Sequence, residues 1–228
     1  MTVIRGIVFD KDGTLFDFHA SWGAWAEGFL ATLSDRPEAL ARAIGFDMTT
    51  RRFAPDSPVI ARTPAQIAAV LLPNLPDRGR NDLLAQMNRL AAAAPMVEAV
   101  PLAALLDGLR AQGLRLGVAT NDSEMPARAH LDRAGITDRF DFIAGFDSGH
   151  GGKPEAGQLL AFCAATGLHP AQVAMVGDSL HDLHAAKTAG MVAVGVLTGP
   201  ALRSDLEMLA DVVLDDIGQL PVWLAKSG

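Results

Sequence analysis

Hydrophobic and polar residues follow two different patterns along the chain. Before residue 17 and beyond about residue 97, short apolar runs rich in β-branched residues alternate with segments whose apolar positions recur at helical spacing. The expected strands are 3–9, 114–119, 142–145, 173–176, 192–196 and 212–214. The expected helices are 102–110, 123–134, 155–166, 181–189 and 202–210. This alternation predicts an α/β protein with a parallel sheet and helices on both faces.

Between residues 17 and 95 the pattern is helical throughout. Six residues recur at helical spacing in its first part: Trp22, Trp25, Ala26, Phe29, Leu30 and Leu33. Segments 38–44, 64–72 and 82–93 repeat the pattern, and no clear strand lies among them. We therefore expect a helical insertion at 17–96, with residues 1–16 and 97–228 forming the α/β core.

Composition limits the classes of protein that this chain can belong to. Of its 228 residues, 50% are hydrophobic and 20% charged, which is typical of a soluble globular protein. The net charge of −7 and the dispersed basic residues argue against a nucleic-acid partner. Cys163 is the single cysteine, which favours a reducing compartment. With no apparent signal peptide and no bilayer-spanning run, we expect a cytoplasmic protein with no membrane partner. Its oligomeric state, monomer or homodimer, stays open.

The first predicted strand ends in two carboxylates, Asp10 and Asp12. Residues i and i+2 of an extended segment point the same way, so both side chains can address one site. Gly13 permits a tight turn, and Thr14 adds a hydroxyl beside the carboxylates. Two negative charges held so close repel each other unless a cation or a proton intervenes. The alternative is a strand that ends in an ordinary Asp-rich turn.

Two further polar clusters lie where predicted helices begin. Thr120 and Asn121 follow a predicted strand, and Asn121 with Glu124 matches a capping box. The same helix start could instead bind an anion, and the two interpretations are compatible. A loop with two glycines places Lys153 where its ammonium could reach a phosphate, although a solvated lysine is the default interpretation.

The last cluster follows the predicted strand 173–176. Asp178 comes directly after this strand, and Asp182 lies one helical turn later. This spacing suits oxygen ligands around Mg²⁺, or a helix-capping acid beside a supporting partner. Because parallel α/β folds bind ligands at the carboxyl ends of their strands, we expect these clusters to meet at one edge of the sheet.

Taken in order, the motifs resemble those of the haloacid dehalogenase-like hydrolase superfamily. The matching segments are Asp10-Lys11-Asp12-Gly13-Thr14, Thr120-Asn121, Lys153-Pro154 and Gly177-Asp178-Ser179 with Asp182. The insertion stands where the phosphoglycolate phosphatase-like branch carries a helical cap. The resemblance implies a Rossmann-like parallel sheet with an inserted helical cap domain, and a Mg²⁺-dependent phosphatase acting on a small phosphorylated metabolite.

The resemblance also implies a role for each catalytic side chain. Asp10 would attack phosphorus and form an aspartyl phosphate, which splits one difficult displacement into two steps. Asp12 would protonate the leaving alkoxide and then activate water. Lys153 would neutralise charge in the transition state, with Asp182 orienting Lys153 or a metal-bound water. Thr14 would support the residues of the first motif.

Binding roles are implied in the same way. Mg²⁺ would be held by Asp10, the backbone carbonyl of Asp12, and Asp178, which lowers the repulsion between nucleophile and phosphate. Thr120, Asn121 and the motif lysine would hold the phosphoryl oxygens.

Branches of the superfamily differ in residues that this sequence contains or lacks. Members that displace halide lack the second aspartate, so the presence of Asp12 disfavours dehalogenation. Between Asp17 and Pro95 there is no lysine, which disfavours the phosphonate-cleaving branch with its Schiff-base lysine. A sugar phosphomutase of the β-phosphoglucomutase type stays open, as does an inactive phosphate-binding regulatory protein.

Two positions depart from the pattern of the family. Lys11 stands where an apolar or aromatic residue is frequent, and we expect its side chain to point away from Asp10 and Asp12 with little effect on the chemistry. Asp122 stands where this branch often has lysine, and we interpret it as an acid at a helix N-terminus.

Within the insertion, the candidate substrate residues are Arg51, Arg52, Arg62 and His19. The hypothesis is that one of the arginines contacts a substrate carboxylate or second phosphate, and the alternative is that all three are solvated. His19 and Trp22 are expected to line the gap between insertion and core.

Overall fold

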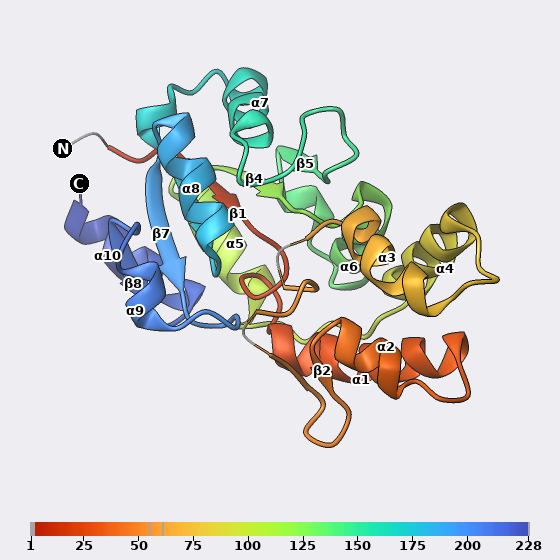
Figure 1. The fold of residues 1–228 in the computed structure, drawn as a ribbon. Helices are drawn as coiled ribbons and strands as arrows, with labels where there is room; N and C mark the ends of the chain where they lie inside the picture. Colours follow the sequence, from red (N-terminus) through yellow and green to blue (C-terminus); the bar gives the residue numbers. More distant parts are fainter. Residues whose placement is uncertain (1–2, 55, 61, 228) are drawn as a thin grey trace.

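A six-stranded parallel sheet forms the centre of the molecule (Figure 1). The computed structural model describes residues 3–54, 56–60 and 62–227. In spatial order the strands are β5 (Phe142–Ala144), β4 (Arg115–Ala119), β1 (Gly6–Phe9), β6 (Val173–Gly177), β7 (Val192–Val196) and β8 (Val212–Leu214). All neighbouring strands in this sheet pair in parallel. Since β1 lies between β4 and β6, three of the predicted polar motifs leave adjacent strands.

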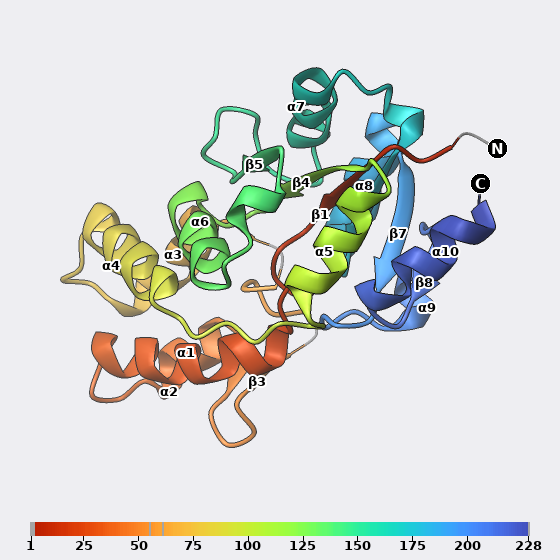
Figure 2. The same cartoon turned by 180° about the vertical axis from the view of Figure 1, so that it is seen from behind.

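Helices cover both faces of the sheet, as Figures 1 and 2 show from opposite sides. One face carries α5 (Leu102–Ala111), α6 (Glu124–Arg133) and α10 (Leu220–Ser227), and the other carries α7 (Gly157–Thr166), α8 (Leu180–Ala189) and α9 (Arg203–Leu206). Along β1, Ile7 and Phe9 pack into the first hydrophobic cluster and Val8 into the second. This alternation is the period of two that a strand buried on both faces shows. The predicted α/β class is confirmed.

The described residues between 17 and 96 form a group of helices beside the sheet (Figure 1). Their elements are α1 (Phe18–Leu33), α2 (Glu38–Ala43), the hairpin β2 (Phe46–Asp47) and β3 (Arg52–Phe53), α3 (Pro64–Leu71) and α4 (Arg80–Ala92). Their buried side chains make a hydrophobic cluster of their own, around Phe29, Leu30 and Leu83. Helix α4 packs against α6 of the core. We call residues 17–96 the cap, and keep the domain division at this segment as a proposal.

One predicted helix, 202–210, is wrong beyond Leu206. The N–H groups of Leu209 and Ala210 both donate to the carbonyl of Leu206, at 3.0 and 2.8 Å, so the helix ends in a turn at this carbonyl. The chain is thereby directed to Asp211, whose carboxylate accepts the N–H of Ala193 in β7 at 2.8 Å. Pairing of this segment with the sheet therefore overrides its helical pattern.

A short hairpin and the last helix lie outside the predicted set. The hairpin of β2 and β3 has two residues per strand, too few to display a period. Helix α10 follows β8 after a short 3₁₀ turn and packs through Leu220 against the core. No helix in the described part of the chain is long and apolar enough to cross a membrane.

Candidate active site

The first motif begins where β1 ends. The N–H of Asp10 donates to the Val176 carbonyl at 2.8 Å, which extends the ladder by one residue beyond the strand. The chain then turns at Gly13, whose φ of +84° lies in the left-handed region. A Cβ at this position would lie 2.4 Å from Oδ2 of Asp178. Glycine is therefore required both by the backbone and by the close approach of Asp178.

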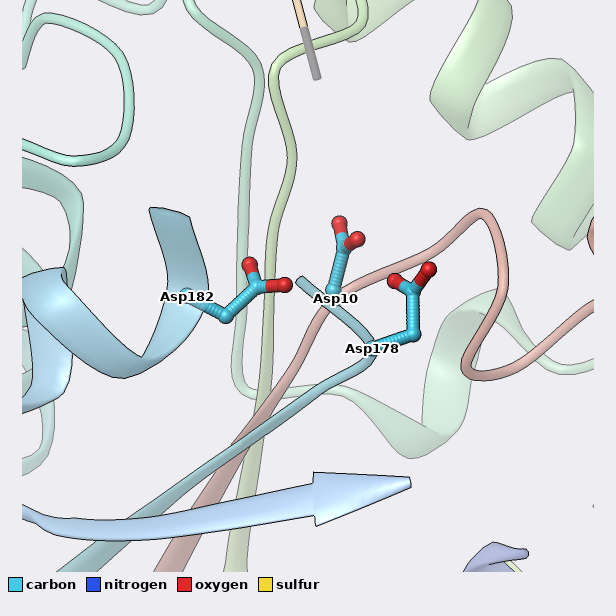
Figure 3. A group of neighbouring side chains, drawn as sticks. All are labelled: Asp10, Asp178 and Asp182. Atoms are coloured by element: carbon cyan, nitrogen blue, oxygen red, sulfur yellow. The ribbon is translucent and has the colours of Figure 1, made fainter. Parts of the chain in front are cut away.

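Three buried carboxylates converge beside this turn: Asp10, Asp178 and Asp182 (Figure 3). One oxygen from each lies within 4.8 Å of the others. Asp182 is fully engaged, because Oδ2 accepts the N–H and hydroxyl of Ser179 at 3.0 and 2.6 Å and Oδ1 pairs with Lys153 at 2.6 Å. Among the described residues, no other side chain donates a hydrogen bond to Asp178, and no lysine or arginine nitrogen lies within 4 Å of it.

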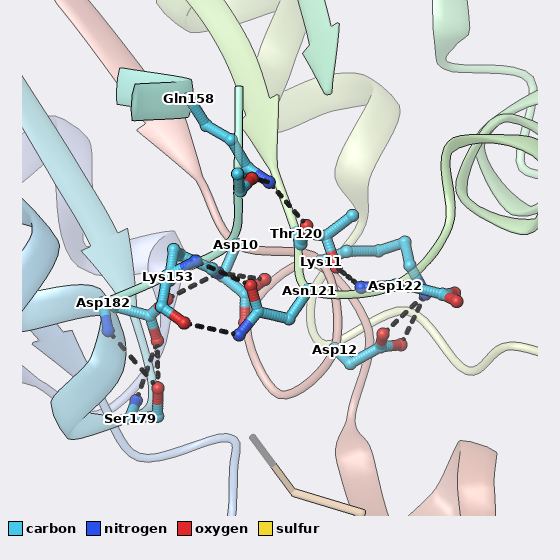
Figure 4. A network of polar contacts seen from close by, with 11 residues as sticks. Asp10, Lys11, Asp12, Thr120, Asn121, Asp122, Lys153, Gln158, Ser179 and Asp182 are labelled. Carbon is cyan, nitrogen blue, oxygen red and sulfur yellow. Dashed lines mark hydrogen bonds and ion pairs between the residues drawn. The ribbon is translucent and has the colours of Figure 1, made fainter. Parts of the chain in front are cut away.

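Lys153 is the cation that this cluster does contain. Its Nζ lies 2.7 Å from Asp10 and 2.6 Å from Asp182, and the side chain is 2% exposed (Figure 4). Burial alone lowers the pKa of Lys153, but the two carboxylates outweigh burial and hold the pKa above its usual value. The ammonium is therefore the favoured form, and it is held between the predicted nucleophile, Asp10, and Asp182.

Asn121 holds the loop that carries Lys153. Its amide donates to the Lys153 carbonyl at 2.9 Å and its Oδ1 accepts the Lys153 N–H at 2.8 Å. The capping box of Asn121 and Glu124 is not formed, because α6 begins at Glu124 and that carboxylate binds Arg128 and Ser148 instead. The Asn121 amide thus fixes the backbone of Lys153 through two hydrogen bonds.

The charges of this cluster do not balance within the described residues. Burial raises the pKa of Asp10 to about 7, with Lys153 lowering it and Asp182 raising it. Burial, and then the neighbouring carboxylates of Asp10 and Asp182, raise the pKa of Asp178 well above its usual value. A second cation between Asp10 and Asp178 would relieve both carboxylates. Hard carboxylate oxygens are the donors that a divalent metal ion prefers, so the donor set fits a metal site.

The expectation for Lys11 is wrong: its side chain turns toward Asp12. Its Nζ lies 2.7 and 2.6 Å from the two oxygens of Asp12 and 3.4 Å from Oδ2 of Asp122, and it is fully buried (Figure 4). Parity of an extended strand no longer applies here, because the chain has left β1 and entered the turn. Asp122 accordingly pairs with Lys11 and does not act only as a helix N-terminal acid. The two departures from the family pattern meet in one ion pair.

A histidine completes the surroundings of Lys11. His130 Nε2 lies 2.7 Å from the carbonyl of Ala91 in α4, so this nitrogen carries the proton and donates it. Nδ1 is then the acceptor for the Lys11 ammonium at 3.1 Å. Burial, and next the charge of Lys11, lower the pKa of His130 to about 4. The neutral imidazole links the first motif to the cap.

Trp22 makes a second link between cap and catalytic motif. Its indole Nε1 donates to Oδ1 of Asp12 at 2.8 Å, so this carboxylate accepts hydrogen bonds from both Lys11 and α1. Asp12 is thereby fixed in one orientation by one group from the core and one from the cap.

A cavity of about 90 Å³ lies between the core motifs and the cap. Of the predicted site residues, Asp10, Asp12, Thr120, Asn121, Lys153 and Arg62 line it. Asp178 and Asp182 are buried beside Asp10 and are not among the lining residues, and Thr14 is buried with no hydrogen-bond partner for its hydroxyl among the described residues. The core motifs therefore converge at one end of the cavity, as their positions at strand ends predict.

The other cap candidates do not reach this cavity. Arg51 pairs with Glu27 at 2.8 Å on the exposed surface, and Arg52 is exposed on β3. His19 packs its ring edge-on against Phe18, with centroids 5.5 Å apart. Cap residues that line the cavity without having been predicted as site residues include Trp25, Ile60, Ile67, Met87 and Asn88. Their apolar spacing is that of any helix face in a core, so only the packing of the cap on the core distinguishes them.

Comparison with known proteins agrees with this geometry. A family model of haloacid dehalogenase-like hydrolases matches residues 4–190. A phosphoglycolate phosphatase from Rhodospirillum rubrum is 33% identical over 236 residues, which cover 96% of this chain and 90% of the relative. The structure of CbbY from Rhodobacter sphaeroides in complex with phosphate has a TM-score of 0.74 at 22% identity over 96% of each chain. A β-phosphoglucomutase from Clostridium difficile has a TM-score of 0.73 at 17% identity, covering 99% of this chain and 96% of its own.

The fold is of the α/β class, and the family model and the curated relative define a hydrolase. The chain belongs to the haloacid dehalogenase-like hydrolase family, and it is a phosphatase.

Proposed function

We propose that this phosphatase is Mg²⁺-dependent and hydrolyses a small phosphorylated metabolite through an aspartyl phosphate on Asp10. The observation that carries the proposal is the position of Asp10 in the lining of the cavity, next to the Lys153 ammonium. The Asp10 carboxylate lies 2.7 Å from the Lys153 ammonium and beside Asp178, whose carboxylate accepts no hydrogen bond from another side chain among the described residues. A carboxylate nucleophile next to a fixed cation is the arrangement that attack on a phosphate dianion requires.

In the first step, an Asp10 oxygen forms a bond to phosphorus while the bond from phosphorus to the alcohol oxygen breaks. Asp12 donates a proton to the departing alkoxide, which it faces from the same cavity. Lys153 neutralises the charge that spreads over the phosphoryl oxygens, and Thr120 and Asn121 line the position that these oxygens occupy.

In the second step, water attacks the phosphorus of the aspartyl phosphate. Asp12, now ionised, takes a proton from this water, and the bond between phosphorus and the Asp10 oxygen breaks. Inorganic phosphate leaves, and both carboxylates return to their starting states. Lys11 and Trp22 hold Asp12 in one orientation, which suits a residue that serves both steps.

Asp10, Asp178 and the backbone carbonyl of Asp12 are the groups that would hold Mg²⁺. When bound, the ion supplies positive charge that offsets the repulsion between the nucleophile and the phosphate. Asp182 does not compete for it, because both of its oxygens are engaged by Lys153 and Ser179. Its role is to keep the lysine in place.

A phosphate-release assay across a metabolite panel, with Mg²⁺ and with EDTA, tests the proposal. We include 2-phosphoglycolate because the relative from R. rubrum is named for it. Release should require Mg²⁺ and should fall at least about a thousandfold in Asp10→Asn, as expected when a covalent nucleophile is removed. A phosphomutase would need a bisphosphorylated activator and would transfer phosphate instead of releasing it. A phosphate-binding regulatory protein would bind without release.

A further inference from the structure

The wall that the cap contributes to the cavity is almost entirely apolar. It is built by Phe18, Trp22, Trp25, Ile60, Ile67 and Met87, which come from α1, the loop before α3, α3 and α4. Trp22 and Trp25 meet edge-on with ring centroids 5.0 Å apart, and Trp25 stacks on Phe29 at 4.9 Å. These rings support one another, so the wall is a packed aromatic surface.

Few polar groups face the cavity from the cap. Asn88 lines it, but its Oδ1 already accepts the hydroxyl of Ser123 at 3.3 Å. The indole N–H of Trp22 donates to Asp12, and that of Trp25 is buried with no hydrogen-bond partner among the described residues. Arg62 is the one charged cap residue among the described lining residues, and it is solvent-exposed. A sugar or a free carboxylate placed against this wall would lose hydrogen bonds to water and gain contacts with carbon atoms. Polar groups without hydrogen-bond partners are costly to bury.

We infer that the alcohol part of the substrate is a compact apolar group, such as an aromatic ring. The inference rests on the proposed function, because it assumes that phosphate binds at Asp10, Thr120 and Lys153. With the phosphate at that end, the rest of the molecule lies against the indoles and aliphatic side chains of the cap. Aromatic rings on such a wall bury large apolar area and adopt edge-on or stacked contacts.

The test compares phosphate release from benzyl phosphate and ethyl phosphate at saturating Mg²⁺. Both esters release a primary alkoxide, and they differ in the apolar group that the cap would contact. We expect kcat/KM to be at least about 30-fold higher for benzyl phosphate, given that a single methylene in an apolar pocket is worth about 10–200-fold. It should also exceed kcat/KM for 2-phosphoglycolate and glucose 6-phosphate. Equal values, or a preference for either polar ester, would overturn the inference.

Variants of the cap residues that line the cavity test whether this wall causes the preference for benzyl phosphate. Ile67→Asn and Trp25→Ala should each lower the benzyl-to-ethyl ratio of kcat/KM about tenfold. Ile67 is half-buried at the cavity, so Ile67→Asn keeps the test valid if Trp25→Ala does not fold. Met125→Ala is the matched control, since Met125 is 52% exposed on α6 and should leave the ratio unchanged. An unchanged ratio in folded Ile67→Asn would contradict the assignment of this wall.

The outcomes also separate the inference from the proposed function. Mg²⁺-dependent release that is abolished in Asp10→Asn, but shows no apolar preference, overturns the inference alone. No release from any of the four esters overturns the proposed function, and the inference with it.

Discussion

Replacing Lys11 by methionine tests the ion pair that the sequence pattern did not predict. Lys11→Met keeps an unbranched side chain of similar length and removes the ammonium. In the native protein this group donates to Asp12 and to His130 Nδ1 and lies 3.4 Å from Asp122, with no exposed surface. The substitution would leave Asp122, whose side chain is only 10% exposed, as a carboxylate without its cation.

The expected loss of stability follows from this burial. Removing one partner of a buried ion pair costs about 3–5 kcal/mol, because the other charge stays buried and unpaired. With a denaturant slope of about 2 kcal/mol/M, the midpoint of urea unfolding should fall by about 2 M. Lys187→Met is the matched control: Lys187 pairs with Asp211 at 2.6 Å, but both side chains are more than 40% exposed. That change should cost about 1 kcal/mol or less.

The dependence on pH has a definite sign. Burial raises the pKa of Asp122 to about 6 even with Lys11 present, so its ionised form is disfavoured in the folded protein. A carboxyl with a raised folded pKa reduces stability as pH rises from about 4 through that pKa. Lys11→Met raises the pKa further, so its cost should be larger at pH 8 than at pH 5. Adding Asp122→Asn to Lys11→Met should recover at least about 2 kcal/mol at pH 8.

Tryptophan fluorescence during urea unfolding measures these quantities. If Lys11→Met costs no more than Lys187→Met, or if Asp122→Asn recovers nothing in its background, the buried ion pair does not stabilise the protein as we argue.

Three further predictions follow from the geometry of the site. Gly13→Ala should lower the free energy of unfolding more than Gly113→Ala. Both glycines have φ near +80°, but only a Cβ at position 13 would meet Asp178. The midpoints of urea unfolding of the two variants give the comparison. Asp178→Asn should stabilise the protein in EDTA, increasingly toward high pH, because burial raises the pKa of that carboxyl and disfavours its ionised form, while calorimetry should show weaker Mg²⁺ binding. His130, with its pKa lowered to about 4, should show a constant Cε1–H chemical shift above pH 6, and a titration near its ordinary value of 6.5 would contradict its neutral contact with Lys11.

The core was predictable because its strands are buried on both faces. Apolar runs such as Val173–Gly177 give unambiguous strand positions, and parallel order then brings the residues that follow them to one edge. Asp10 and Asp178 meet for this reason, since β1 and β6 are neighbours. The positions of residues that directly follow a strand could therefore be predicted best from the sequence.

The environment of Asp12 was not predictable from periodicity. Side-chain parity holds only within the strand, and Lys11 lies beyond it in a turn where the long side chain folds back. Its partners Asp122 and His130 come from distant segments that only the folded chain brings together. The sequence showed that Lys11 and Asp122 stand at atypical positions. It did not show that their opposite charges pair in the folded protein.

The cap was predictable as helices and not as a binding surface. Of the arginines proposed from its loops, Arg62 lines the cavity while Arg51 is used in a surface pair. The apolar residues of α1, α3 and α4 serve both the cap's own core and the cavity wall, and one helical pattern cannot distinguish these uses.

Detection of the covalent intermediate tests the central claim most directly. The enzyme is mixed with a hydrolysed ester and Mg²⁺, quenched in acid within one turnover, digested, and analysed by mass spectrometry. We expect phosphate on the peptide that contains Asp10, formed and lost at rates compatible with turnover, and absent from Asp10→Asn. Full turnover with no phosphorylated Asp10 peptide at any time, or activity surviving in Asp10→Asn, would contradict it.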